Sequence, residues 1–437
     1  MYSNWSLRIP ALGVEKVCAR LDGDERFCLL TTGPSTAAAR QQTLLTAMEW
    51  SHGLLDPGDQ IIFRRLCRFS GSFSAPAATA VAGTEDGKSW EVDDALARLV
   101  EKSLLAFEDG EPPRYRLLET LQYYGLKKLE EAGESETIAE RHRRYFLALF
   151  EPADEVWETM PDADWLRPRA PDIDNIRLSL DRSLGRPDLD QDGIALFGTS
   201  GRLWYMLDLV PEGREYGDKL GALIDDNTPA ATAARALGYN GISWRDADRA
   251  KSVALKERSA ALYRQIGDRL NLGSALSLLG GDLAYLGRYT EAKAVLDEAR
   301  DLLASSNRLK SLWNIINELG VLAQLGNDIA EAVRCFGLGR ELARTLKDVL
   351  REGIILFNLG EVEFRLGAID RAIERARESA IREPTEQALR DRLAEIPAVN
   401  LTPDDIRVWA AEGARWSPEY AVEFTLRRIV PPAGPEP

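Results

Sequence analysis

The sequence predicts a mainly α-helical protein in which a winged helix with a short β-hairpin is followed by an α-solenoid of paired helices. Apolar residues recur at helical spacing along most of the 437 residues. Between residues 103 and 118 this pattern changes to two short runs around a Gly/Pro turn, which indicates a hairpin. Further along, Leu-Gly pairs recur at one constant interval, at Leu279, Leu319 and Leu359. A fixed period of this length is typical of helical repeats.

The winged helix is predicted from the front of the chain. Its hairpin strands are expected at 103–107 and 114–118, where basic and apolar side chains alternate in the second strand. Asp56-Pro57-Gly58 and Ser74-Ala75-Pro76 carry the turn chemistry that separates helices. Helices are expected around the hairpin over 43–55, 62–73, 75–82, 91–102 and 119–132.

Each repeat is expected to consist of two antiparallel helices joined by a tight turn. The glycine of each Leu-Gly pair allows close approach of the second helix, and Ala292, Ala332 and Ala372 provide small residues at the same interval. Gly287, Gly326 and Gly367 lie near the turns, and a degenerate earlier unit covers 234–267. Because each unit buries its apolar face only against its neighbours, the units are expected to stack into a solenoid.

Five segments are expected along the chain. The helical linker between winged helix and repeats has long polar connections over 152–174 and 185–193. Two proline-initiated helices are expected near the end, after Thr402 and Ser417. The segments are a helical stretch at 1–40, the winged helix at 41–133, the linker at 134–226, paired-helix repeats at 227–400, and C-terminal helices with a Pro-rich tail at 401–437.

The composition excludes several classes of function. With 55 basic and 70 acidic residues, the net charge of −15 argues against a surface that follows nucleic-acid phosphates along its whole length. Four cysteines form no CxxC pair, and only two histidines are present, which excludes His-rich metal centres. No apolar run is long enough to span a bilayer. We therefore expect a cytoplasmic protein with no cofactor and no membrane contact.

The repeats are expected to bind rather than catalyse. Stacked helix pairs form a concave groove lined by the first helix of each pair, and amide side chains there suit a protein or peptide partner. For any single residue of this groove, an ordinary solvent-exposed position is an equally good interpretation. The candidate groove residues are Ser277, Asn314, Asn317, Gln324, Phe357, Glu361 and Arg365.

A DNA-binding role of the winged helix is the first alternative. The basic candidates are Arg98 and Lys102 on the helix over 91–102, with Arg114 and Arg116 on the hairpin. Acidic residues at least match them in number on the same elements, so counterion release would contribute little to DNA affinity. Packing against protein is the better interpretation of this surface.

Two motifs suggest other chemistry. Ala82–Ser89 has the loose form of a phosphate-binding loop, so an ATPase is a second, less favoured alternative. A working loop follows a β-strand, whereas alanine-rich helix precedes this one, and Glu85 and Asp86 would repel phosphate. Residues 188–193 begin like a calcium loop, but Thr199 stands where the bidentate glutamate is needed. Both motifs are expected to be surface turns.

Several motifs resemble the bacterial signal-transduction ATPases with numerous domains (STAND), including LuxR-type and antibiotic-regulator-type multidomain regulators. The resemblance lies in Arg40-Gln41-Gln42-Thr43-Leu44, in Leu96–Leu104, in Tyr115–Thr120 and in Arg141–Leu149, and the repeated units resemble tetratricopeptide repeats. In that family a whole P-loop domain precedes the first motif, whereas residues 1–40 here resemble only a remnant of the helical end of that domain. The resemblance therefore implies the winged-helix and repeat part of such a regulator without its ATPase domain.

The expected function is that of a non-enzymatic regulatory or scaffold protein in signal transduction or transcription control. It would bind a protein or peptide through the repeat groove, and a separate P-loop ATPase domain is one candidate partner. Direct contact with nucleic acid is disfavoured by the acids beside Arg98 and Lys102.

Overall fold

A computed structural model describes residues 46, 48–83, 89–366, 368 and 371, and it confirms the mainly α-helical fold with a small sheet and a helical solenoid. All of these residues belong to one compact unit, Met1–Ser379. The remnant expected at 1–40, the end of the repeats after 371, and the segment at 401–437 lie outside the described residues. No helix within the described part of the chain is long and apolar enough to cross a membrane.

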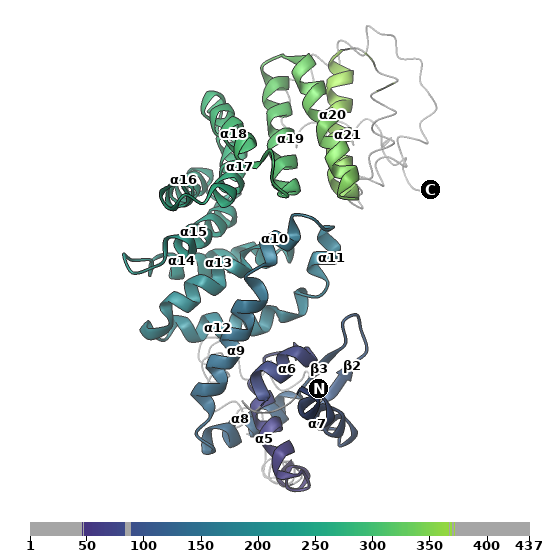
Figure 1. Ribbon diagram of the computed structural model, residues 1–437, viewed down its shortest axis with the longest axis vertical. Helices are drawn as coiled ribbons and strands as arrows, with labels where there is room; N and C mark the ends of the chain where they lie inside the picture. Colours follow the sequence, from purple (N-terminus) through teal and green to yellow (C-terminus); the bar gives the residue numbers. More distant parts are fainter. Residues whose placement is uncertain (1–45, 47, 84–88, 367, 369–370, 372–437) are drawn as a thin grey trace, which may run out of the picture. The chain divides into compact units, whose positions relative to one another are not determined.

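The first described elements are helices around a three-stranded sheet, and we keep the name winged helix for this part of the segment 41–133 (Figure 1). Residues 48–53 are helical, and two antiparallel pairings give the sheet order β1-β3-β2, in which Tyr115 pairs with both Phe73 and Phe107. The elements are α5 (Pro57–Leu66), β1 (Ser72–Phe73), α6 (Ala75–Ala82), α7 (Ser89–Glu101), β2 (Ala106–Glu108), β3 (Arg114–Arg116) and α8 (Glu119–Glu131).

Strand β1 corrects one expectation. The apolar spacing predicts a helix that continues to Phe73, but α5 ends at Leu66. Gly71 follows with φ +71°, a left-handed conformation that suits glycine, and the chain then enters the sheet. Phe73 is fully buried there. The apolar Phe73 side chain therefore packs into the core from a strand rather than from a helix.

The linker is more ordered than its polar sequence suggests. The stretches at 152–174 and 185–193, expected as long connections, contain two short α-helices and two 3-10 turns, Ala170–Asp172 and Pro187–Leu189. The α-helices of the linker are α9 (Ser135–Phe150), α10 (Ala153–Trp157), α11 (Asp162–Leu166), α12 (Ile173–Leu184), α13 (Asp190–Met206) and α14 (Val210–Gly221).

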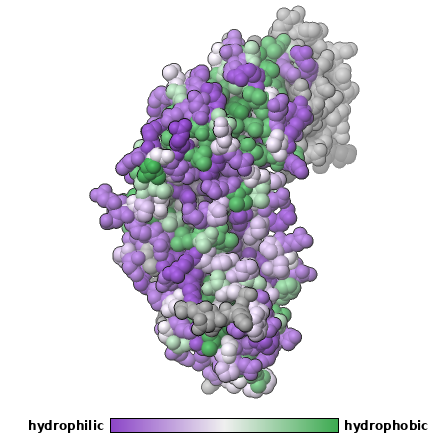
Figure 2. Space-filling model, in the orientation of Figure 1, coloured by the Kyte–Doolittle hydropathy of each residue, from purple (hydrophilic) through white to green (hydrophobic). Residues whose placement is uncertain are grey.

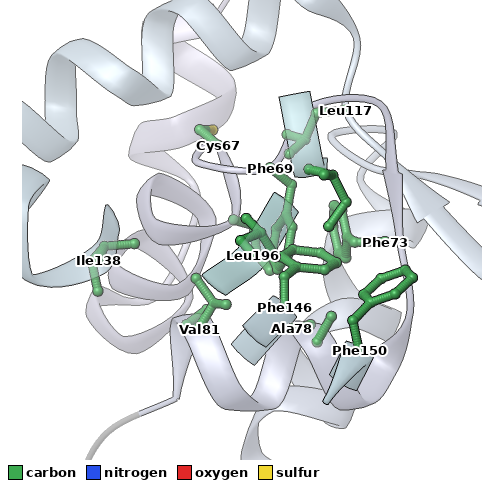
Figure 3. Packing of buried hydrophobic residues seen from close by; sticks show 14 of the residues in the cluster. Cys67, Phe69, Phe73, Ala78, Val81, Leu117, Ile138, Phe146, Phe150 and Leu196 are labelled. Atoms are coloured by element: carbon green, nitrogen blue, oxygen red, sulfur yellow. The ribbon is translucent and has the colours of Figure 1, made fainter. Parts of the chain in front are cut away.

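One hydrophobic core joins the winged helix to the linker (Figure 3). Phe69 stacks on Phe73 with ring centroids 4.3 Å apart, and Phe146 of α9 meets Phe69 edge-on at 6.5 Å. Leu196 of α13 belongs to the same buried cluster. The core therefore extends across the turn between α8 and α9, where the sequence analysis places a boundary between 133 and 134.

The repeats follow the period of the Leu-Gly pairs. The first helices of three successive units begin at Arg269, Leu309 and Val349. An added Cβ at Gly320 would lie 2.5 Å from Phe336, so the Leu-Gly pairs do permit close helix contact. The helices are α15 (Ala230–Trp244), α16 (Arg249–Ile266), α17 (Arg269–Tyr285), α18 (Tyr289–Leu303), α19 (Leu309–Leu325), α20 (Ile329–Thr345) and α21 (Val349–Arg365).

Four of the six turns between the described repeat helices contain a residue in the left-handed conformation, and Lys347 with φ +52° is one of them. Gly267 and Gly287 have φ +74° and +75°. In the next unit the left-handed residue is Asn327 rather than Gly326, and asparagine tolerates this conformation better than most residues. Gly367 lies outside the described residues. The face of the molecule drawn in Figure 2 is mostly hydrophilic, with hydrophobic side chains gathered in small areas.

Candidate functional site

A cavity of about 460 Å³ lies against the inner side of the first repeats. The first helices α15, α17 and α19 provide most of its wall, and the linker helix α10 closes one side. Equivalent positions of successive repeats face it: Asn271, Ser311 and Arg351 are each one repeat period apart, and so are Ser274 and Asn314. The repeat period thus places a row of polar side chains along one surface.

The wall of this cavity is rich in charge of both signs. Five arginines and five carboxylates line it, together with four aromatic rings. The aromatic residues are Trp157, Tyr205, Tyr239 and Tyr263. The charged residues are Arg202, Arg235, Arg245, Arg308, Arg351, Glu151, Asp154, Glu155, Glu158 and Glu318.

Trp157 of α10 is held between cations from two parts of the chain. The guanidinium of Arg202 lies 3.4 Å from the ring centroid, and Nζ of Lys310 lies 4.4 Å from it. Both distances are within the range of cation–π attraction. Arg202 also pairs with Asp154 at 3.0 Å, and the Tyr239 hydroxyl donates to the same carboxylate. Burial raises the pKa of Tyr239 well above its ordinary value, so the phenol keeps its proton.

Glu158 holds the first turn of α19. Its carboxylate accepts hydrogen bonds from the backbone amides of Lys310 and Ser311, each at 2.9 Å, and from the Ser311 hydroxyl. Glu158 is only 2% exposed. The first amides of a helix have no partner within the helix, and the helix dipole favours a negative charge beside them. A linker side chain therefore supplies the cap of a repeat helix.

Asp162 of α11 adds ion pairs to this contact. Lys310 donates to its carboxylate, and Arg351 at the start of α21 lies 3.3 Å from it. Burial alone would raise the pKa of Asp162, but Arg351 and Lys310 outweigh that effect and keep the pKa below its ordinary value. Arg308 and Glu155 form a further pair at 3.4 Å. We call this set the linker–repeat contact: Glu155, Glu158 and Asp162 on the linker, and Arg308, Lys310, Ser311 and Arg351 on the repeats.

A second buried charge cluster lies within the repeats. Asp282 of α17 is fully buried and pairs with Lys256 of α16 and, at 3.0 Å, with Arg249. Burial lowers the pKa of Lys256 to about 8, despite its pairing with Asp282. Burial also raises the pKa of Glu318, which faces the cavity. The pairs made by Asp282 fix how α16 and α17 meet.

The structure divides the residues predicted for the groove. Ser277 and Asn314 line the cavity. Asn317 and Gln324 are not in its wall and are buried, and Asn317 accepts a hydrogen bond of 2.9 Å from Asn358. Phe357 is 53% exposed, and Glu361 pairs with Arg365 at 2.9 Å on the exposed surface of α21.

Sequence reasoning missed other lining residues. Asn271, Ser274 and Ser311 could have been found by applying the repeat period to Asn314 and its neighbours. The linker residues Trp157 and Glu158 carry no local signal, because their partners lie far along the chain.

The four basic residues considered for DNA contact are engaged within the protein. Arg98 makes two hydrogen bonds with the buried Asp59, at 2.8 and 2.7 Å, and Lys102 donates to the Leu54 carbonyl at 3.0 Å. Arg114 is buried and bonds to Ser72 and Asp172. Arg116 pairs with Glu108 at 3.0 Å.

The other motifs have ordinary surroundings where they are described. Helix α6, not a strand, precedes the loop-like Ala82–Ser89, and residues 84–88 lie outside the described part. Asp188 and Asp192 pair with Arg186 and Arg143, each at 2.7 Å. Among the described residues no group of His, Cys, Asp and Glu has the arrangement of a metal site.

No protein-family model matches this chain. A protein of Mycobacterium tuberculosis (strain ATCC 25618 / H37Rv) named "Putative HTH-type transcriptional regulator Rv0890c" is 30% identical over 413 residues, which cover 84% of this chain and 45% of that protein. "Uncharacterized protein Rv0894" of the same strain is 30% identical over 161 residues, covering 31% of this chain and 41% of that protein. The chain thus spans less than half the length of these relatives.

Solved structures with a similar course of the chain were also found. One is a STAND protein with a tetratricopeptide repeat sensor from Pyrococcus horikoshii, with a TM-score of 0.47 and 10% identity, covering 84% of this chain and 56% of that chain. Another is BtubC from P. vanneervenii, with a TM-score of 0.39 and 12% identity, covering 52% of this chain and 94% of that chain.

Proposed function

We propose that this chain is a non-catalytic regulatory protein of signal transduction or transcription control, which binds a protein or peptide partner on the inner side of its repeats. The observation that carries the proposal is the 460 Å³ cavity, whose wall follows the repeat period and presents amides, hydroxyls and charges of both signs. Polar groups in register along a groove suit an extended segment of another protein. The name of the mycobacterial relative supports a regulatory role.

The resemblance to STAND regulators suggests which kind of protein the partner is. A separate P-loop ATPase domain is the first candidate, because the resembling regulators carry such a domain next to their winged helix. In this proposal the repeats receive a signal and the winged helix transmits it. The continuous core between winged helix and linker supports such transmission, since movement of one would displace the other.

Capture of partners by the full chain tests this function. Asn314→Trp would fill part of the cavity, whereas Glu298→Gln changes an exposed residue outside its wall. We expect a protein from the native host to bind the unmodified chain and the Glu298→Gln variant, and to be lost from Asn314→Trp while the melting temperature is kept. Titration with the purified partner should show the same difference, with the weakest affinity for the Asn314→Trp variant. A partner that binds all three equally would refute a role of the cavity.

Two further assays address the alternatives. Sequence-independent DNA affinity should be absent in a mobility shift at about 150 mM salt, because the candidate basic residues are paired within the protein. ATP titration should detect no binding either to the unmodified chain or to Lys88→Ala. A DNA complex that persists at this salt, or ATP binding that depends on Lys88, would favour the corresponding alternative.

A further inference from the structure

The linker–repeat contact joins segments that are far apart in the sequence. Lys310 and Asp162 are 148 residues apart, and Arg351 and Asp162 are 189 residues apart. Three carboxylates on α10, α11 and the turn between them face three basic side chains at the first turns of α19 and α21. The hydrophobic clusters that include α19 and α21, in contrast, contain no residue of α10 or α11, whereas Trp157 shares a cluster with Tyr239 of the earlier helix α15. Polar and charged groups therefore dominate the contact between these segments.

This contact also borders the cavity. Glu155, Glu158, Arg308, Ser311 and Arg351 belong both to the contact and to the cavity wall. Separation of α10–α11 from the first turns of α19 and α21 would therefore widen the cavity on that side. The helix pairs of the repeats are held by their own apolar clusters and need not unfold for this to happen.

We propose that the linker–repeat contact is a gate to the cavity, and that an acidic segment of the partner opens it by replacing Glu158 and Asp162. That the opening segment belongs to a partner rests on the proposed function, whereas the existence of the gate does not. Opening leaves two backbone amides of α19 and the Lys310 ammonium without their acceptors, whereas Arg308 keeps Asn271 and Arg351 keeps Asp348. Unpaired buried donors are costly, so a segment that supplies carboxylates is the chemistry that fits.

Thiol labelling at the cavity wall tests the gate in the full chain. Ser277 lines the cavity and is 3% exposed, so Ser277→Cys places a reporter there. Cys18→Ser and Cys28→Ser remove two other thiols. Cys67, fully buried in the winged-helix core, and Cys335, buried in the repeats, remain as internal monitors of unfolding. Labelling of each site is followed by mass spectrometry.

Glu158→Gln combined with Asp162→Asn removes both charges at nearly constant shape. We expect labelling at position 277 to become at least about tenfold faster, with Cys67 unchanged, because removing one side of a buried charged contact is costly. Glu298→Gln, which removes an exposed pair with Arg264, is the matched control and should change neither rate. If both sites accelerate together, or if neither does, the contact is not a gate.

A synthetic peptide with the sequence of residues 151–168 tests the opener. Added to the reporter chain with an intact contact, it should accelerate labelling at position 277, whereas the same peptide with Gln and Asn in place of Glu158 and Asp162 should not. Equal effects of the two peptides, or none, would refute an acidic opener. This result is independent of the partner capture, which depends on Asn314.

Discussion

Arg114 of strand β3 donates a hydrogen bond to the carboxylate of Asp172, which immediately precedes helix α12. Both side chains are buried, with 6% and 7% of their surface exposed. The wing of the winged helix is therefore tied to the linker by a charge pair shielded from water. Such a pair fixes the position of the hairpin, and its loss should be felt far more strongly than the loss of a surface pair.

Arg114→Met should destabilise the protein by about 3–5 kcal/mol, because it leaves the buried Asp172 carboxylate without its partner. Urea denaturation measures the loss. Arg116→Met is the matched control: further along the same strand, Arg116 is 56% exposed in its pair with Glu108, so the change should stay below about 1 kcal/mol. Equal effects of both substitutions would contradict a special role of the buried pair.

Gly320→Ala tests the close approach of the repeat helices. The added methyl group would lie 2.5 Å from the ring of the fully buried Phe336, so we expect a loss of about 1–3 kcal/mol in the free energy of unfolding. Gly337→Ala in the facing helix α20 has nothing within 4 Å and should be neutral or stabilising by about 0.5–1 kcal/mol. The difference between the two urea midpoints is the measurement, and its absence would argue against tight packing at this pair.

His142 predicts a pH dependence of stability. The ring is buried between Ser179 and Asn175, each at 3.1 Å, and burial lowers its pKa to about 3. The unfolded chain takes up a proton near pH 6.5, whereas the folded chain does not, so stability is complete above that pH and falls below it. Between pH 7.5 and 5.5 the loss should approach about 1.4 kcal/mol.

The control for this prediction removes the group that titrates. His142→Asn should flatten most of the pH dependence of the urea midpoint over that range, even if the variant is less stable throughout. His52, the other histidine of the chain, also has a pKa lowered by burial and contributes to the remaining slope. An unchanged slope in His142→Asn would show that another group titrates.

Trp157 is expected to stabilise the junction of linker and repeats. Trp157→Ala should cost about 3–5 kcal/mol, since the ring is buried and contacts Arg202 and Lys310. Trp157→Phe keeps a ring and should lose less, mainly the hydrogen bond of 2.7 Å from Nε1 to Asp162. Trp90→Ala, at a 54% exposed position, serves as the control and should change the urea midpoint little.

The sequence predicts the repeat helices well because their signals are local and periodic. Leu-Gly pairs and small residues mark helix contacts within one unit, and α17, α19 and α21 each begin one repeat period apart, as expected. Strand β1 could not be found in the same way. It is very short, and its pairing depends on Tyr115 and Arg116 of β3, which lie beyond two intervening helices and a further strand.

Of the cavity wall, the sequence indicates only two residues of the repeat helices. Ser277 and Asn314 lie where the helical period places them, in the wall of the cavity. Glu158 could not be recognised, because its two amide partners are 152 and 153 residues further along the chain. An acidic residue in a polar stretch has the same local appearance whether it faces water or caps a distant helix. Only the tertiary fold, which brings Glu158 to the start of α19, distinguishes a capping residue from a solvent-exposed one.

The core shared by the winged helix and the linker limits how these two parts can be separated or recombined in evolution. If the chain were divided at Gly133, the rings of Phe69 and Phe73 would lose Phe146, and Leu196 would lose the same cluster. Neither half could then be recombined with a foreign neighbour without a new apolar surface to cover it. Residues 48–239, which this core spans, are therefore expected to pass between related proteins as a single piece.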